Sequence, residues 1–173
     1  MPRKGRPPPD AVRHDAGGDL AAAGLALADM AGLPGRGRRV TIRLPDGDAL
    51  LIDEAYNANP ASMRATLAML GQEKGRKVAI LGSMRELGPE EAELHAALAQ
   101  PISEAGVDLA LLVGTEMKPL AEALEGKVEF VHVPDAAAAA DRALRLIASG
   151  DAVLVKGSNS VGLAGVVDAL AGG

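Results

Sequence analysis

The chain has 173 residues, enough for one domain with a buried core, and its formal net charge is −5. Acidic and basic residues are interspersed, which excludes the clustered basic surface of a nucleic-acid-binding protein, and the lack of cysteine excludes disulfides and thiolate metal sites. No apolar run approaches the roughly 18 residues of a membrane span. We therefore expect a soluble, cytoplasmic protein without membrane insertion, and we take it to be a monomer.

The first part of the chain predicts little packed structure. Residues 1–10 are basic and rich in proline, a composition that predicts a disordered tail. Residues 19–31 predict a short helix rich in alanine and leucine, and the helix-breaking sequence at 32–35 ends it. The arginine-rich segment 36–39 follows, and we interpret it as a hinge-like linker.

From residue 40 onward the pattern alternates between strands and helices. Residues 40–44 and 49–52 predict two strands joined by a hairpin turn at 45–48, and a helix is expected at 60–70. Four short apolar strands follow, each with a helix after it. The strands are expected at 78–81, 109–113, 128–133 and 152–155, and the helices at 90–100, 116–124, 136–147 and 161–170.

Short apolar strands that alternate with helices are typical of a parallel sheet covered on both faces. The sequence therefore predicts an α/β fold. We expect a Rossmann-like, doubly wound, mostly parallel sheet with an antiparallel N-terminal hairpin strand and helices on both faces. Ligands of such sheets bind beyond the carboxyl ends of the strands. This rule selects four candidate binding loops, at residues 53–60, 82–88, 114–117 and 156–160.

The loop after the second strand carries the densest group of polar side chains, among them Asp53, Tyr56, Asn57 and Asn59. A carboxylate at a strand end can accept hydrogen bonds from both hydroxyls of a ribose, and a phenol ring can lie against a base. Asn59 has an alternative role, since it could cap a helix that begins at Pro60. That structural role does not account for Asp53, Tyr56 and Asn57 together.

Four blocks of sequence resemble, in the same order and spacing, the carboxy-terminal domain of the Mur ligases that add D-alanyl-D-alanine. The resemblance covers roughly residues 36–171. A single block would be weak evidence, whereas four in order are specific. The blocks are Ile52-Asp53-Glu54-Ala55-Tyr56-Asn57-Ala58-Asn59-Pro60-Ala61-Ser62-Met63, then Ala79-Ile80-Leu81-Gly82-Ser83-Met84-Arg85-Glu86-Leu87-Gly88 with His95 after it, then Val113-Gly114-Thr115, and finally Leu154-Val155-Lys156-Gly157-Ser158-Asn159-Ser160.

The resemblance implies an amide-bond-forming reaction of peptidoglycan precursor synthesis. ATP activates the peptide carboxylate of UDP-MurNAc-tripeptide as an acyl phosphate, and the amine of D-alanyl-D-alanine attacks it. Arg36 matches an arginine that reaches the terminal phosphate of ATP, a task that suits a guanidinium because it stays charged and binds oxygens bidentately. The alternative is that Arg36 belongs, with Arg38 and Arg39, to a solvated basic turn.

The resemblance also implies roles for the loop after the second strand. Asp53 would hold the ATP ribose, and Tyr56 would contact the nucleoside. Asn57 and Asn59 would line the nucleotide or substrate cleft.

A second candidate binding loop follows the last strand, and the resemblance implies that Lys156, Ser158 and Asn159 face D-alanyl-D-alanine. Backbone amides at the start of a helix suit a carboxylate or a phosphate. The alternative is that Ser158 or Ser160 simply caps the last helix. The second block departs from the family pattern, which usually has aspartate where Ser83 stands, so no role is transferred to that side chain.

We expect no metal site in this chain, because His14 and His132 have no partners at metal-ligand spacing. His95 matches a family position, but it lies within a predicted helix, and we interpret it as a packing residue. The glycines between 82 and 88 lack the GxGxxG spacing of a dinucleotide-binding loop.

The sequence contains no GxxxxGK[ST] phosphate-binding loop. The resemblance implies that this loop, and the residues that hold Mg²⁺, belong to a central domain that would precede residue 1. We interpret residues 11–35 as the remnant last helix of that ATPase domain with its linker, and residues 36–173 as the carboxy-terminal domain. ATP and Mg²⁺ are thus expected as cofactors of the whole enzyme, and we expect no ligase activity from the 173-residue chain alone.

Two other functions remain compatible with the sequence. One is a non-catalytic module that binds a nucleotide or another small ligand and has lost the chemistry. The other is part of a different ligase of the same superfamily, such as a folylpolyglutamate synthase, which the string at 56–60 disfavours.

Overall fold

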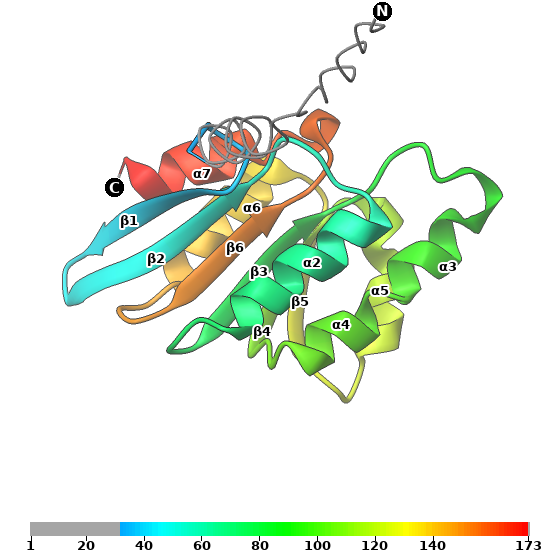
Figure 1. Ribbon diagram of the computed structural model, residues 1–173, viewed down its shortest axis with the longest axis horizontal. Helices are drawn as coiled ribbons and strands as arrows, with labels where there is room; N and C mark the ends of the chain where they lie inside the picture. Colours follow the sequence, from blue (N-terminus) through cyan, green and yellow to red (C-terminus); the bar gives the residue numbers. More distant parts are fainter. Residues whose placement is uncertain (1–31, 173) are drawn as a thin grey trace, which may run out of the picture.

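The structure is a computed structural model that describes residues 32–172 (Figure 1). The tail expected at 1–10 and the helix expected at 19–31 lie outside the described residues, as does most of the segment 11–35. The described part of the chain forms one six-stranded sheet with helices on both of its faces.

The sheet consists of six strands, β1 (Arg38–Leu44), β2 (Gly47–Glu54), β3 (Lys77–Gly82), β4 (Leu109–Val113), β5 (Glu129–Val133) and β6 (Ala152–Lys156). Their order across the sheet is β1-β2-β6-β3-β4-β5. β1 and β2 form the antiparallel hairpin, and all the other neighbouring strands are parallel. The α/β fold predicted from the sequence is therefore confirmed.

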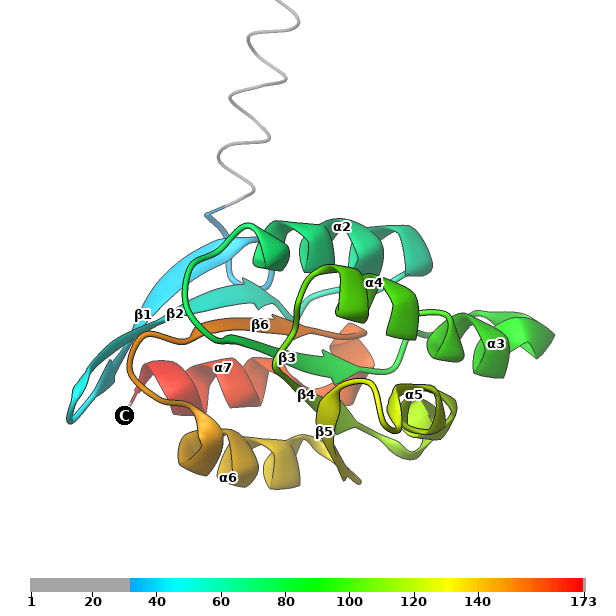
Figure 2. The same cartoon turned by 90° about the horizontal axis from the view of Figure 1, so that it is seen from below.

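Within residues 32–172 the strands are accompanied by six α-helices and three short 3₁₀ turns. The helices are α2 (Pro60–Gly71), α3 (Glu91–Ala96), α4 (Ala99–Glu104), α5 (Lys118–Leu124), α6 (Ala136–Leu146) and α7 (Ala164–Ala171), and the turns are at Gly88–Glu90, Thr115–Met117 and Asn159–Val161. α2 and α4 lie on one face of the sheet, and α6 and α7 lie on the other (Figure 2). Side chains of a strand alternate between faces, so Leu154 enters one buried aliphatic core and Val155 the other. Within residues 32–172, no helix is long and apolar enough to cross a membrane.

α2 begins where the sequence predicts, because Asn59 and Ser62 form a capping box. The Ser62 N–H donates to Asn59 Oδ1 at 2.8 Å, and the Asn59 N–H donates to Ser62 Oγ at 3.1 Å. Pro60 occupies the first turn, where its missing N–H costs nothing. The helix-capping interpretation of Asn59 is confirmed.

Two helix predictions need correction. The helix expected at 90–100 is instead two short helices, α3 and α4. Pro101 stands in the first turn of α4 and can neither donate to the Ala97 carbonyl nor fit beside it, so one continuous helix is excluded. The last helix starts at Ala164, later than expected, because Gly162 has a left-handed φ of 82° that ends the preceding 3₁₀ turn.

β6 is the last strand of the chain, yet it lies inside the sheet between β2 and β3. All of its residues, from Ala152 to Lys156, are buried. Because β6 runs parallel to β2, the carboxyl ends of the two strands meet at the same edge, with Glu54 paired with Lys156. The candidate binding loops at residues 53–60 and 156–160 therefore lie at this edge of the sheet.

Candidate functional site

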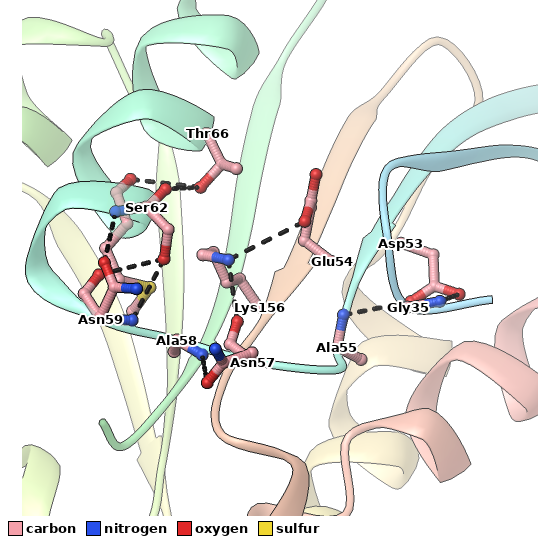
Figure 3. Close-up of polar contacts among 11 residues, drawn as sticks. Gly35, Asp53, Glu54, Ala55, Asn57, Ala58, Asn59, Ser62, Thr66 and Lys156 are labelled. Atoms are coloured by element: carbon pink, nitrogen blue, oxygen red, sulfur yellow. Dashed lines mark hydrogen bonds and ion pairs between the residues drawn. The ribbon is translucent and has the colours of Figure 1, made fainter. Parts of the chain in front are cut away.

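The candidate site lies at the carboxyl ends of β2 and β6, where the linker before β1 folds back onto the sheet. Three segments that are far apart in the sequence meet there, at residues 33–38, 53–60 and 156–160. Figure 3 shows the polar contacts of the first two segments and of Lys156. This is the edge at which ligands of doubly wound sheets bind.

Asp53 is almost completely buried, with 2% of its surface exposed, and its carboxylate accepts three hydrogen bonds. Oδ2 accepts from the Gly35 N–H at 2.8 Å and from the Arg38 guanidinium at 3.4 Å. Oδ1 accepts from the Ala55 N–H at 3.2 Å. A carboxylate accepts about four hydrogen bonds in all. Counting donors among the described residues, Asp53 therefore has one acceptor position left in this conformation.

The linker is attached to the end of β2 by backbone hydrogen bonds as well. The Gly37 N–H donates to the Asp53 carbonyl at 2.8 Å, and the Tyr56 N–H donates to the Gly35 carbonyl at 3.1 Å. Gly35 has a left-handed φ of 74°, and a Cβ placed on it would lie 2.8 Å from the Cβ of Tyr56. Only glycine fits this close approach.

Tyr56 and Arg36 are in direct contact. The guanidinium carbon of Arg36 lies 4.0 Å from the centroid of the Tyr56 ring, which is the geometry of a cation–π interaction. Tyr56 as a whole residue is nevertheless 48% exposed. The arginine expected to reach a phosphate thus rests on the tyrosine expected to contact a nucleoside.

A pocket of about 220 Å³ adjoins this contact. Sequence analysis had selected three of its residues, Asp53, Tyr56 and Asn159, but missed two charged ones, Arg38 and Asp168. In the sequence, Arg38 stands out only as part of the alternative, solvated basic turn, and Asp168 lies in α7, which carries no motif. Asp168 could not be assigned without knowing that α7 packs against β1 of the hairpin. The pocket is lined by Pro34, Gly35, Arg38, Asp53, Ala55, Tyr56, Asn159, Ala164, Val167 and Asp168.

Asn57 and Asn59 are exposed but have local partners (Figure 3). Asn57 Oδ1 accepts from the Ala58 N–H at 2.8 Å, and Asn59 forms the capping box of α2. The structure brings Asn57 close to the end of β6, because its carbonyl accepts a hydrogen bond from Lys156. Asn59 faces the start of α2, and neither residue lines the 220 Å³ pocket.

Lys156 is buried, with 3% of its surface exposed, and its ammonium points at the loop after β2 (Figure 3). Nζ donates to the Asn57 carbonyl at 2.8 Å and lies 3.8 Å from Glu54 Oε2. Burial lowers the pKa of Lys156, against the opposing effect of Glu54. Burial likewise raises the pKa of Glu54, although Lys156 acts to lower it. In this conformation Lys156 holds the 54–57 loop, and its contact with a substrate stays a prediction.

Ser158 and Asn159 begin the loop after β6. The Ser158 N–H donates to the Ser83 carbonyl at 3.0 Å, which ties this loop to the end of β3. Ser158 Oγ lies 3.3 Å from Ser160 Oγ, and it makes no side-chain capping bond to the turn that follows. Asn159 is exposed at the pocket.

A second group of polar side chains follows β3 and β4. Arg85 donates to Ser160 Oγ at 3.0 Å and to Glu116 Oε1 at 2.9 Å. A hydrogen bond from its own backbone N–H, together with Arg85, lowers the pKa of Glu116. The Ser83 hydroxyl is buried and has no hydrogen-bond partner among the described residues.

His95 is fully buried and organises the loop after β3. Its Nε2 accepts from the Met84 N–H at 2.9 Å, so the ring proton lies on Nδ1, which faces the Glu91 carbonyl at 2.8 Å. His95 is therefore a structural histidine that positions the loop after β3, as the sequence indicated. His132 contacts the Gly114 carbonyl through Nε2 at 2.6 Å.

Within residues 32–172, no three His, Cys, Asp or Glu side chains gather closely enough to hold a metal ion. The donor set present here therefore does not fit a resident Mg²⁺, and we assign no step of chemistry to a metal bound by these residues.

Residues 37–159 match the family described as "Mur ligase, glutamate ligase domain", which is well over half of the chain. The chain belongs to the Mur ligase family. The resemblance seen in the four sequence blocks is thus confirmed. The matched range contains Asp53, Tyr56 and Lys156, and it begins one residue after Arg36.

Individual Mur ligases resemble this chain more specifically. The UDP-N-acetylmuramoyl-tripeptide–D-alanyl-D-alanine ligase of Escherichia coli (strain K12) is 35% identical over 162 residues, which are 92% of this chain and 34% of that protein. A MurF structure from Acinetobacter baumannii has a TM-score of 0.70 at 26% identity, covering 82% of this chain and 31% of that one. The MurF ligase of Thermotoga maritima, solved in complex with ADP, has a TM-score of 0.65 at 26% identity, covering 81% and 31%.

The chain therefore spans about one third of the length of the curated Mur ligase that it matches.

Proposed function

We propose that this chain is the carboxy-terminal domain of an ATP-dependent ligase that adds D-alanyl-D-alanine to UDP-MurNAc-tripeptide. The proposal is supported by the 35% identity, over 92% of the chain, to a ligase with that name. A structural relative solved with ADP supports the use of ATP. Because ATP and a UDP-linked precursor are compounds of the cytoplasm, we place the protein there.

In the proposed reaction, the terminal carboxylate of the peptide attacks the γ-phosphorus of ATP. This gives an acyl phosphate and ADP. The amine of D-alanyl-D-alanine then attacks the acyl carbon, an amide bond forms, and inorganic phosphate leaves with one proton released. Catalysis of this kind depends on positioning and on stabilising charge at the phosphates.

The observation that carries the proposal is the convergence of Asp53 and Tyr56 on one pocket at the carboxyl ends of β2 and β6. We assign this pocket to the nucleoside end of ATP, with Tyr56 against the base and Asp53 at the ribose. Arg36, next to the pocket, would supply positive charge at the terminal phosphate. Lys156, Ser158 and Asn159 border the same edge, where we place D-alanyl-D-alanine.

The chain supplies only part of such an active site. Its sequence has no GxxxxGK[ST] loop to cradle a triphosphate. In the whole ligase, ATP would therefore lie between the pocket described above and a phosphate-binding loop on a different segment, which would also hold Mg²⁺. For the 173-residue polypeptide alone, we expect no D-alanyl-D-alanine ligation.

A chimera tests the proposal. Residues 36–173 replace the corresponding residues of the E. coli relative, and formation of ADP and of the amide product is measured with UDP-MurNAc-tripeptide and D-alanyl-D-alanine. We expect activity that disappears without either substrate and falls at least about fivefold with Tyr56→Ala, the loss that corresponds to a stacking contact of about 1–3 kcal/mol. The matched control is Arg43→Ala, an exposed residue of β1 outside the site.

A chimera that is folded and binds ATP but forms no product would contradict the proposed reaction. If the isolated chain still bound ADP at Tyr56 in that case, a non-catalytic nucleotide-binding module would be the better description. Ligation by the isolated chain would contradict the need for a separate phosphate-binding loop.

A further inference from the structure

We infer that the linker occupies the nucleoside-binding positions of its own site, and that it is displaced when a nucleotide binds. The residues concerned are Gly35 and Arg36, which precede β1, and Arg38, the first residue of β1. This inference rests on the function proposed above, and it adds a conformational step that couples nucleoside binding to the position of Arg36.

Tyr56 is the first position that the linker and a bound nucleoside would both occupy, and we call such a position an overlap. The Arg36 guanidinium carbon lies 4.0 Å from the ring centroid, so it covers one face of the only tyrosine in the chain. A base stacked on that face would need the same space. Cation–π contact and base stacking are therefore alternatives at this face of Tyr56.

The second overlap is at Asp53. Gly35 and Arg38 occupy both acceptor positions of Oδ2, and Ala55 occupies one of Oδ1. A ribose that donates both of its hydroxyls needs two acceptor positions, but one is left. Ala55 follows β2 directly and stays in place. Gly35 precedes β1, and Arg38, the first residue of β1, reaches Asp53 through a partly exposed side chain, so the Gly35 N–H and the Arg38 guanidinium are the donors that can leave.

The two overlaps are linked through the backbone, because the residues concerned lie within four positions of each other. Arg36 stands between Gly35 and Gly37, which have left-handed φ angles of 74° and 81°. Hinges absorb large changes of φ and ψ at a few residues of this kind. When a ribose displaces the Gly35 N–H from Asp53, the same backbone change moves Arg36 away from Tyr56.

The consequence is an ordered exchange. Without nucleotide, the linker satisfies the buried carboxylate and covers the aromatic ring. With nucleotide, the ribose and the base take over these contacts, and the Arg36 guanidinium is released. The released guanidinium is the group that we assign to the terminal phosphate of the same nucleotide, so binding at one end of ATP frees the charge required at the other.

The experiment uses the 173-residue chain, adenosine as the probe, and Arg36→Ala. Adenosine has no phosphate, so the proposed phosphate contact of Arg36 does not contribute to its affinity. We expect Arg36→Ala to bind adenosine about two- to fivefold more tightly than wild type in an NMR titration followed at Tyr56, the range that an exposed cation–π contact implies. Arg43→Ala, which removes the same charge from an exposed position, should match wild type.

A second measurement needs no ligand. The chain has one tyrosine and no tryptophan, so its intrinsic fluorescence reports on Tyr56 alone. Acrylamide should quench this fluorescence more strongly in Arg36→Ala than in wild type or Arg43→Ala. Equal quenching in all three would overturn the inference, because the ring would not be covered.

The adenosine titration separates two kinds of failure. If Tyr56→Ala weakens adenosine binding but Arg36→Ala leaves it unchanged, the nucleoside site stands and the linker inference is wrong. If no variant shows an adenosine-dependent shift at residue 56 or its neighbours, the proposed nucleoside site is wrong, and the inference falls with it.

Discussion

The ammonium of Lys156 donates a hydrogen bond to the backbone carbonyl of Asn57, at 2.8 Å and across 99 positions of sequence. It joins the end of the last strand to the loop that carries Tyr56. Lys156 is buried and its partner carboxylate, Glu54, is only partly so. The loop that we assign to the nucleoside is therefore held in place by a cation that does not itself line the pocket.

Replacing Lys156 by methionine should destabilise the protein by about 2–3 kcal/mol, because the Asn57 carbonyl would lose its charged donor and the Glu54 carboxylate would lose its ion-pair partner. Chemical denaturation with urea would measure this loss. Lys118→Met is the control, since Lys118 forms an exposed pair with Glu122 at 3.9 Å and its removal should cost less than about 0.5 kcal/mol. Equal losses in the two variants would show that the buried contact contributes nothing.

Glu54 should make the free energy of unfolding decrease as the pH rises. Burial raises its pKa above 4.5, so just above pH 4.5 the folded state binds more protons than the unfolded state. This contribution to stability is fully present below pH 4.5 and is lost as the pH rises through the folded-state pKa. The free energy of unfolding of wild type, measured relative to Glu54→Gln, should thus fall as the pH rises above 4.5 and through the folded-state pKa.

Glu116→Gln provides the matched control for that measurement, because the contribution of Glu116 to stability should change with pH in the opposite direction. The pKa of Glu116 is lowered, chiefly by its own backbone N–H and also by Arg85. Its contribution is present above pH 4.5 and is lost as the pH falls through the folded-state pKa. Two parallel pH profiles for these variants would refute the assignment of the Glu54 shift to burial.

Asn59→Ala should lower the free energy of unfolding by about 1 kcal/mol, because it removes one half of the capping box of α2. Amide hydrogen exchange at Ser62 and Met63 should speed up as the first turn frays. Asn159→Ala replaces an exposed asparagine whose side chain caps no helix, and it should leave stability unchanged. Exchange that is unchanged at Ser62 would contradict a capping role for Asn59.

Gly35→Ala should release the linker from β2, because the new methyl group would meet Tyr56 at 2.8 Å. Hydrogen exchange of the Tyr56 N–H, which donates to the Gly35 carbonyl, should accelerate at least about tenfold, as the loss of about 1.4 kcal/mol of local stability implies. Gly88→Ala is the control, since Gly88 has a similar φ of 68° but open space around it. An unchanged Tyr56 amide in Gly35→Ala would show that the linker is not docked in solution.

Much of the fold could be predicted from local sequence. The strand at 109–113 is found as expected, because a short run of buried aliphatic residues between turns has few alternatives. The helix at 60–70 was equally clear from its cap and its proline. The interruptions of helices were harder to predict from the sequence, because each depends on a single residue inside an otherwise helical stretch. These residues are Pro101, after the break between α3 and α4, and Gly162, before the late start of α7.

The site was only partly predictable. Asp53 and Tyr56 could be selected because they follow a strand directly, but the docking of Arg36 on Tyr56 depends on how the linker folds back. The burial of Lys156 follows from the position of β6 between β2 and β3, and no periodicity in the sequence encodes strand order. Asp168 reaches the pocket only because α7 packs beside the hairpin.

The central position of β6 also has a consequence for biosynthesis. A nascent chain that has not yet emerged past Ala152 contains the β1–β2 hairpin and the β3–β4–β5 portion of the sheet, but it lacks the strand that connects them. Both portions then expose an unpaired strand edge, a common starting point for misfolded assemblies. The sheet can close only after translation has passed Lys156, so this protein must finish folding late, from non-local contacts.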